Sequence, residues 1–134
     1  RSLHGINVHG FPNLFILGLA QGGSLVANVT HNFTESASAI AAMIGQCLES
    51  GSETLEPTAE AEQAWLDRLE VQDRGFLANC TPGYYNNEGS AASDRDLFST
   101  ARYPDGPVAF FEYLRQWASN GTFEGLEFSP PSND

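Results

Sequence analysis

The sequence predicts an α/β fold that is mostly helical, with one or few strands. First, residues 14–17 form a short apolar run of the length expected for a strand buried on both faces. Second, the glycine-rich residues 18–23 follow directly and are typical of a turn between a strand and a helix. Third, apolar residues recur at helical spacing in three later segments. With 134 residues, of which 41% are hydrophobic, the chain has the size and composition of one ordinary domain.

The charge balance excludes several classes of partner. The chain has 17 Asp and Glu against six Arg, no Lys, and a formal net charge of −11. A protein that neutralises nucleic-acid phosphates or anionic lipid headgroups needs the opposite sign. No apolar run reaches the ~18 residues of a membrane-spanning helix. We therefore expect a cytoplasmic protein that binds neither nucleic acid nor membrane.

The N-terminal part is organised around the predicted strand and turn. Residues 1–10 have no regular pattern, and Pro12 disfavours a helix at this point. Ser24 is an acceptable N-cap for a helix that begins after the turn. A strand buried on both faces needs neighbours in a sheet, and this chain offers few candidates. We therefore expect the chain to be a piece of a longer polypeptide or one product of a cleavage.

A regular helical pattern runs from residue 33 to Gly51, a residue suited to the left-handed backbone that ends many helices. Steps of three and four residues predict that one face of this helix is apolar. The residues of that face are Phe33, Ala37, Ile40, Ala41, Ile44, Cys47 and Leu48. Residues 51–57 are then expected to form a short link.

The second half of the chain predicts two further helices separated by a long loop. Thr58 can cap a helix that ends near residues 75–78. Residues 79–106 are rich in Gly, Asn, Ser, Asp and Pro, and a loop of this length is often functional. A third helix is expected from residue 105 onward.

The C-terminal residues predict the end of the fold. Gly121 is placed to follow the third helix. Residues 123–128 alternate between apolar and polar side chains and predict a final strand. Residues 129–134 are expected to be a frayed tail.

The glycine-rich turn is the strongest candidate site. Glycines let a ligand approach the backbone, and a helix start supplies free N–H groups and the positive end of the helix dipole. These features suit an anionic or electron-accepting ring edge. An ordinary strand–helix turn is an equal alternative from local features alone. The chain has no G-x-G-x-x-G sequence, so the fingerprint of a pyrophosphate-binding turn is absent.

The other candidate residues are less specific. Tyr84 and Tyr85 either contact a ligand or anchor their loop to the core. His31 has no fixed carboxylate partner in the sequence, which favours a structural role. The remaining histidines and the two cysteines, Cys47 and Cys80, lack the spacing of a metal site. Four N-x-[ST] sequons would matter only in a secreted protein, and we expect them to be unmodified.

Four blocks of sequence together resemble the C-terminal part of the flavin-containing Baeyer–Villiger monooxygenases. They are GFPNLFILG at 10–18 with the turn that follows it, TLEPTAEAEQAWLDRL at 54–69, CTPGYYNNEG at 80–89 and FEYLRQWASNGTFEGLEF at 111–128. The blocks occur in the family's order and cover nearly the whole chain. The first block is shared with related flavoprotein monooxygenases, whereas the four together are much more specific.

This resemblance implies an enzyme that uses FAD, NADPH and O2. Through a peroxyflavin it would insert one oxygen atom into a ketone and give an ester or lactone. The fold would be the C-terminal segment of a flavoprotein with two dinucleotide-binding domains. Residues 1–51 would supply the last strand, glycine turn and helix of the FAD-binding domain. Residues 52–134 would supply the C-terminal helices, the cofactor-site loop and the closing strand.

The resemblance also implies particular site residues. The flavin-edge turn would contain Gln21, Gly22, Gly23, Ser24, Asn28 and Val29. Tyr84 would take the place of a Trp that helps many members hold NADP, and Tyr85 would face the substrate.

Several parts of the family's machinery are expected upstream of Arg1. These parts are two dinucleotide fingerprints, a signature motif and an arginine that assists the peroxyflavin. None of the six Arg residues here is expected to take that role, so no catalytic residue is assigned within this chain. We therefore expect the chain to be inactive alone and completed by an N-terminal part of the enzyme. The alternative is a non-catalytic, acidic ligand-binding or interaction module derived from this family.

Overall fold

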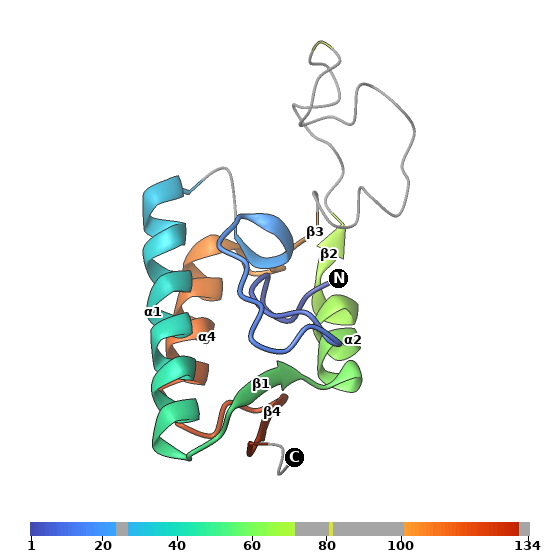
Figure 1. Ribbon diagram of the computed structural model, residues 1–134. Coiled ribbons are helices and arrows are strands. Elements are labelled where there is room, and N and C mark those ends of the chain that lie inside the picture. The colour runs from blue at the N-terminus through green and yellow to red at the C-terminus, as the bar shows by residue number, and fades with distance from the viewer. Residues whose placement is uncertain (24–26, 72–80, 82–100, 132–134) are drawn as a thin grey trace.

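The computed structural model describes residues 1–23, 27–71, 81 and 101–131. Its elements are η1 (Ala20–Gly22), α1 (Val29–Glu49), β1 (Thr54–Pro57), α2 (Ala59–Arg68), β2 (Glu70–Val71), β3 (Ala101–Arg102), α4 (Gly106–Ser119) and β4 (Leu126–Ser129). The prediction of a mostly helical chain with few strands is confirmed. Helices α1 and α4 lie side by side, and the N-terminal segment lies between them and α2 (Figure 1).

The strands form two small antiparallel pairs. β1 pairs with β4, with Leu55 opposite Phe128, and β2 pairs with β3. The prediction that residues 51–57 are only a link is wrong, because β1 lies within them. The final strand is confirmed over 126–128 but begins later than predicted. Before it, Phe123 has φ 44° and Gly125 has φ 89°, which is the backbone of a turn.

The prediction of a buried strand at residues 14–17 is wrong for this structure. No strand is assigned there, and Leu14 and Leu17 are 42% and 51% exposed. The Ile16 N–H donates to the Ile6 carbonyl at 2.7 Å, but no described segment pairs along the run. An apolar run becomes a buried strand only when neighbouring strands are present to accept and donate its hydrogen bonds.

Helix α1 begins later than the predicted start at Ser24. Asn28 is its N-cap, because the Asn28 side-chain oxygen accepts from the His31 N–H at 3.0 Å. The predicted end is confirmed, since the helix stops at Glu49 and Gly51 has φ 69°. The predicted apolar face is confirmed for Cys47, which is buried, and for Ile40, which packs partly buried against the core. The prediction is wrong for the other residues of that face, which are not part of the core. The residues that face the core are Asn32, Glu35, Ser36, Ala39, Met43 and Cys47.

The other two helices begin where the sequence predicts. The Thr58 hydroxyl accepts from the Ala61 N–H at 3.1 Å and caps α2. Helix α2 ends at Arg68, before the predicted end near residues 75–78, because the chain turns there into β2. Helix α4 has Asp105 as its N-cap, and Gly121 follows it with φ 68°. None of the helices in the described part of the chain is long and apolar enough to cross a membrane.

The core is an aromatic cluster closed around an N-terminal hook, residues 2–7. The Leu3 N–H donates to the Asn7 carbonyl at 2.7 Å, and this closes the hook. His4 and Gly5 make the turn with φ 54° and 74°, and a Cβ on Gly5 would lie 2.3 Å from the Ala20 carbonyl oxygen. The hook therefore packs tightly against η1, and only glycine fits that position.

His4 is the buried titratable group at the centre of this core. Its ring lies edge-on to Trp65, Tyr113 and Trp117, with centroids 4.5 to 5.2 Å away. His4 Nε2 and the Tyr113 hydroxyl are 2.9 Å apart and form a hydrogen bond. Burial, aided by the positive charge of Arg68, lowers the pKa of His4 from 6.5 to about 3. The imidazole is therefore neutral in the folded chain at neutral pH.

We predict that this neutral histidine makes the fold acid-sensitive. The unfolded chain takes up a proton on His4 below about pH 6.5, whereas the folded chain does not do so until about pH 3. The free energy of unfolding should therefore fall by up to about 1.4 kcal/mol per pH unit in that window from this group alone. Urea unfolding across the window should show a shallower pH dependence for His4→Gln than for the parent. Parallel curves for the two proteins would contradict the prediction.

Candidate functional site

The predicted site begins in the turn η1, where Gln21 is buried. Gln21 has left-handed backbone, with φ 55° and ψ 30°, and its side chain is 2% exposed. Its side-chain oxygen accepts from the Ser2 hydroxyl at 2.5 Å, and its carbonyl accepts from the Trp65 indole N–H at 2.8 Å. Gln21 therefore ties the turn to the N-terminal hook and to α2.

Gly22 and Gly23 are required by packing within the chain. A Cβ on Gly22 would lie 2.6 Å from the Phe110 ring, and one on Gly23 would lie 3.0 Å from the Asn32 side-chain oxygen. The two glycines thus let the turn sit directly against α4 and α1. The sequence pattern allowed close approach of a ligand or an ordinary turn, and the structure shows close approach of neighbouring side chains.

The start of α1 is the exposed part of the predicted site. Asn28 and Val29 are both exposed, and no acidic residue lies in the first turn. The Asn28 carbonyl accepts from the Asn32 side-chain amide at 2.9 Å, so the cap is held from two sides. The N–H groups of Val29 and Thr30 donate to no residue that the structure describes. With the helix dipole behind them, these groups can donate to an electron-rich atom of a ligand.

A charged network anchors the first turns of α1 to α4. Arg115 donates to the Glu35 carboxylate from both Nε, at 2.8 Å, and Nη2. His31 Nε2 lies 3.3 Å from Glu35 Oε1, and the His31 ring is edge-on to Phe111 at 4.9 Å. The hydrogen bonds from Arg115 lower the pKa of Glu35 below its ordinary value. This network was not predicted, because Glu35 and Arg115 are 80 residues apart in sequence.

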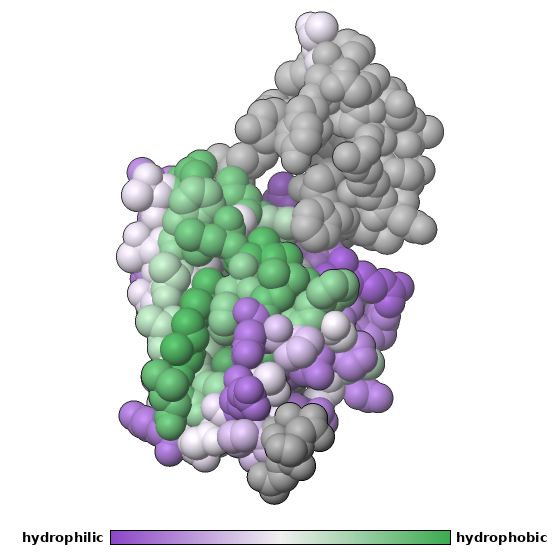
Figure 2. Space-filling model, viewed as in Figure 1, coloured by the Kyte–Doolittle hydropathy of each residue, from purple (hydrophilic) through white to green (hydrophobic). Residues whose placement is uncertain are grey.

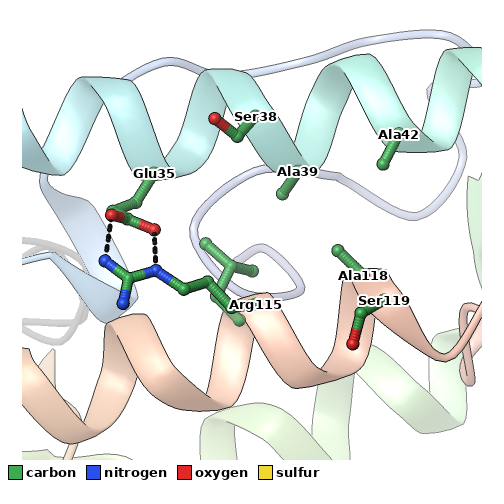
Figure 3. A pocket seen from close by; sticks show the side chains of 8 residues that line it. Glu35, Ser38, Ala39, Ala42, Arg115, Ala118 and Ser119 are labelled. Atoms are coloured by element: carbon green, nitrogen blue, oxygen red, sulfur yellow. Dashed lines mark hydrogen bonds and ion pairs between the residues drawn. The ribbon is translucent and has the colours of Figure 1, made fainter.

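A shallow groove runs between α1 and α4 beside this network (Figure 3). It is lined by Glu35, Ser38, Ala39, Ala42, Leu114, Arg115, Ala118 and Ser119. Most of these side chains are small, and the ion pair lies at one end. None of the predicted site residues lines the groove.

The structure brings together only some of the predicted residues. Gln21, Gly22 and Gly23 lie in one turn, and the Asn32 side chain joins that turn to the helix start at Asn28. Ser24, Tyr84 and Tyr85 lie outside the described residues. Within the described ranges, no group of three or more metal-ligating side chains occurs, and Cys47 is a buried free thiol.

Curated relatives match nearly the whole chain. It is 39% identical to the FAD-binding monooxygenase hmp7 of Hypomyces subiculosus over 127 aligned residues. This alignment covers 92% of this chain and 21% of that protein. It is 43% identical to a Baeyer–Villiger monooxygenase of Streptomyces coelicolor over 129 aligned residues, and this alignment covers 94% of this chain and 20% of that protein. The chain thus spans about a fifth of the length of these relatives. No model of a known protein family matches it.

Solved structures share the fold. The polycyclic ketone monooxygenase from Thermothelomyces thermophila superposes with a TM-score of 0.77 at 29% identity, over 96% of this chain and 21% of that one. Cyclohexanone monooxygenase from Rhodococcus sp. Phi1, bound to NADP+, superposes with a TM-score of 0.70 at 18% identity, over 97% of this chain and 23% of that one. The resemblance read from the four sequence blocks is therefore confirmed. By sequence and by fold, the chain is similar to a C-terminal portion of the Baeyer–Villiger monooxygenases.

Proposed function

We propose that the chain is one part of an FAD- and NADPH-dependent monooxygenase that inserts one oxygen atom from O2 into a ketone. The product would be an ester or lactone. The observation that carries this proposal is the match of more than nine-tenths of the chain to named monooxygenases at 39% and 43% identity. The fold shared with a polycyclic ketone monooxygenase supports a ketone as the substrate class.

The start of α1 is the part of this chain best suited to contact a flavin. A bound flavin would take electrons from NADPH and transfer an oxygen atom from O2 to the ketone. The N–H groups of Val29 and Thr30, with the positive end of the helix dipole, would donate to the electron-rich edge of the ring. Asn28 would keep these groups in place by capping the helix.

The buried turn would have a supporting role. Gln21, Gly22 and Gly23 contact neighbouring parts of the chain. We therefore propose that they position the backbone that leads through Ser24 to α1. In this proposal residues 1–51 belong to the FAD-binding domain and residues 52–134 to the C-terminal part. Tyr84 is proposed to contact NADP and Tyr85 the substrate.

The test uses a complete enzyme, defined here as this chain joined to the preceding four-fifths of the Streptomyces coelicolor relative. We expect the purified protein to be yellow and to oxidise NADPH faster when a cyclic ketone is added. Ester or lactone should be detected by gas chromatography, and the chain alone should give none. A folded, colourless complete enzyme would contradict the proposal and favour a non-catalytic module.

We predict that Gly22→Ala weakens flavin retention in the complete enzyme. The added Cβ would meet the Phe110 ring at 2.6 Å and displace the turn, which should cost about 1–3 kcal/mol of stability. Flavin absorbance per protein after gel filtration measures the loss. Gly45→Ala is the matched control, because a Cβ there meets nothing within 4 Å. Combining Gly22→Ala with Phe110→Leu should restore part of the flavin content, and equal retention in all variants would count against the placement.

We predict that two substitutions of Asn28 separate helix capping from flavin contact. Asn28→Ala removes the cap and should lower stability by about 1 kcal/mol, measured by urea unfolding. Asn28→Asp keeps the cap and the stability, but adds a negative charge beside the proposed ring edge. The midpoint potential of the flavin in the complete enzyme should therefore fall in Asn28→Asp. An unchanged potential would place the flavin away from this helix start.

A further inference from the structure

A fixed negative charge lies close to the start of α1. Arg115 of α4 donates to the Glu35 carboxylate from Nε, at 2.8 Å, and from Nη2 (Figure 3). Glu35 is 8% exposed, and the hydrogen bonds from Arg115 lower the pKa of its carboxyl group. The carboxylate is therefore ionised at neutral pH and held in one place.

Packing between the two helices gives no reason for this ion pair. Among its 21 residues, α1 has two acidic side chains and no Lys or Arg, and Figure 2 shows apolar surface along much of this helix. Beside the ion pair, small side chains such as Ala39 and Ala118 already fill the contact between α1 and α4. Replacing a buried ion pair by apolar side chains is often neutral or stabilising. The charge of Glu35 therefore calls for a role other than packing.

His31 is the group on which this charge acts. Its Nε2 atom lies 3.3 Å from Glu35 Oε1, and its ring is edge-on to Phe111, with 4.9 Å between the ring centroids. An ionised carboxylate only accepts hydrogen bonds, so it favours a hydrogen on Nε2 of the neutral imidazole. Nδ1 is then an acceptor, and it has no hydrogen-bond partner among the described residues. A proton can therefore be held at Nδ1, with Glu35 stabilising the positive ring.

The other charges around His31 act in known directions. On α4, Arg115 pairs with the Glu35 carboxylate, and Glu112 acts in turn on Arg115. On α1, the positive end of the helix dipole opposes a positive charge on His31. Within the described ranges, His31 forms no ion pair other than that with Glu35. Glu35 is therefore the group that makes a positive imidazole acceptable at this helix start.

We propose that protonation of His31 raises the electron affinity of a flavin held at the start of α1. This inference rests on the proposed function, in which the N–H groups of Val29 and Thr30 donate to the flavin edge. His31 lies in the same helical turn as these two residues. Its protonated ring places a positive charge near the electron-rich edge and so favours electron uptake. Arg115 and Glu35 act through His31, as positioning residues.

The midpoint potential of the flavin in the complete enzyme tests this inference. It is measured from about pH 5.5 to about pH 8, a range that brackets the ordinary titration of histidine. His31→Gln keeps a polar side chain but does not titrate. His9→Gln is the matched control, because His9 is exposed, binds the Pro57 carbonyl oxygen through Nδ1 at 2.9 Å and takes no part in the proposed site. Urea unfolding checks that each variant keeps its fold.

The expected difference depends on pH. At about pH 8, where the imidazole is neutral, the parent and both variants should give the same ratio of reduced to oxidised flavin at a given poise. At about pH 5.5, the ratio should be at least about threefold higher in the parent and in His9→Gln than in His31→Gln. In a Glu35→Gln background, adding His31→Gln should separate the curves only at lower pH, because the carboxylate that stabilises the positive ring is absent.

The possible failures are distinguishable. A yellow enzyme in which the parent and His31→Gln give parallel curves would overturn this inference and leave the proposed function intact. An equal effect of His9→Gln would also overturn it, because the effect would not belong to His31. A separation that keeps its pH in the Glu35→Gln background would remove the role of Glu35. A folded, colourless complete enzyme would remove the proposed function and this inference with it.

Discussion

The described fold depends on the burial of the N-terminal hook between α2 and α4. Trp65 from α2 and Tyr113 and Trp117 from α4 surround the His4 ring, and Leu3 and Ile6 fill the adjoining core. These contacts hold together three segments that are distant in sequence. They also fix the turn η1, because the Trp65 indole donates to the Gln21 carbonyl. Aromatic rings are well suited to this task, since each buries a large apolar area and its polar tip can still find a partner.

How much of the fold could be predicted depended on how local each signal was. The cap at Thr58 and the helix end at Gly51 were predicted correctly, because a cap is decided by residues within one turn. The strand β1 was missed, because its four residues form a strand only by pairing with β4, some 70 residues later. The inner face of α1 was misjudged because Glu35 reads as a surface residue until Arg115, 80 residues away, is placed beside it.

The candidate site, too, could be predicted only as far as its features are local in sequence. The sequence correctly predicted a turn followed by a helix, since the two are close in the chain, but it placed the helix start at Ser24 and not at Asn28. It did not reveal which of them is internal. The glycines at 22 and 23 are consistent with a ligand or with close packing, and the positions of Phe110 and Asn32 account for them by close packing. The backbone donors with no partner among the described residues lie instead at Val29 and Thr30, where the sequence shows nothing more than an ordinary helix start.

The short pairing of β2 with β3 fixes where the chain leaves the described fold and where it returns. Glu70 lies opposite Arg102 and Val71 opposite Ala101, so the two ends of the intervening segment are held together next to the core. The entropic cost of closing a loop grows only slowly with its length. A change in the number of residues between positions 71 and 101 therefore alters the cost of bringing these two strands together only slightly.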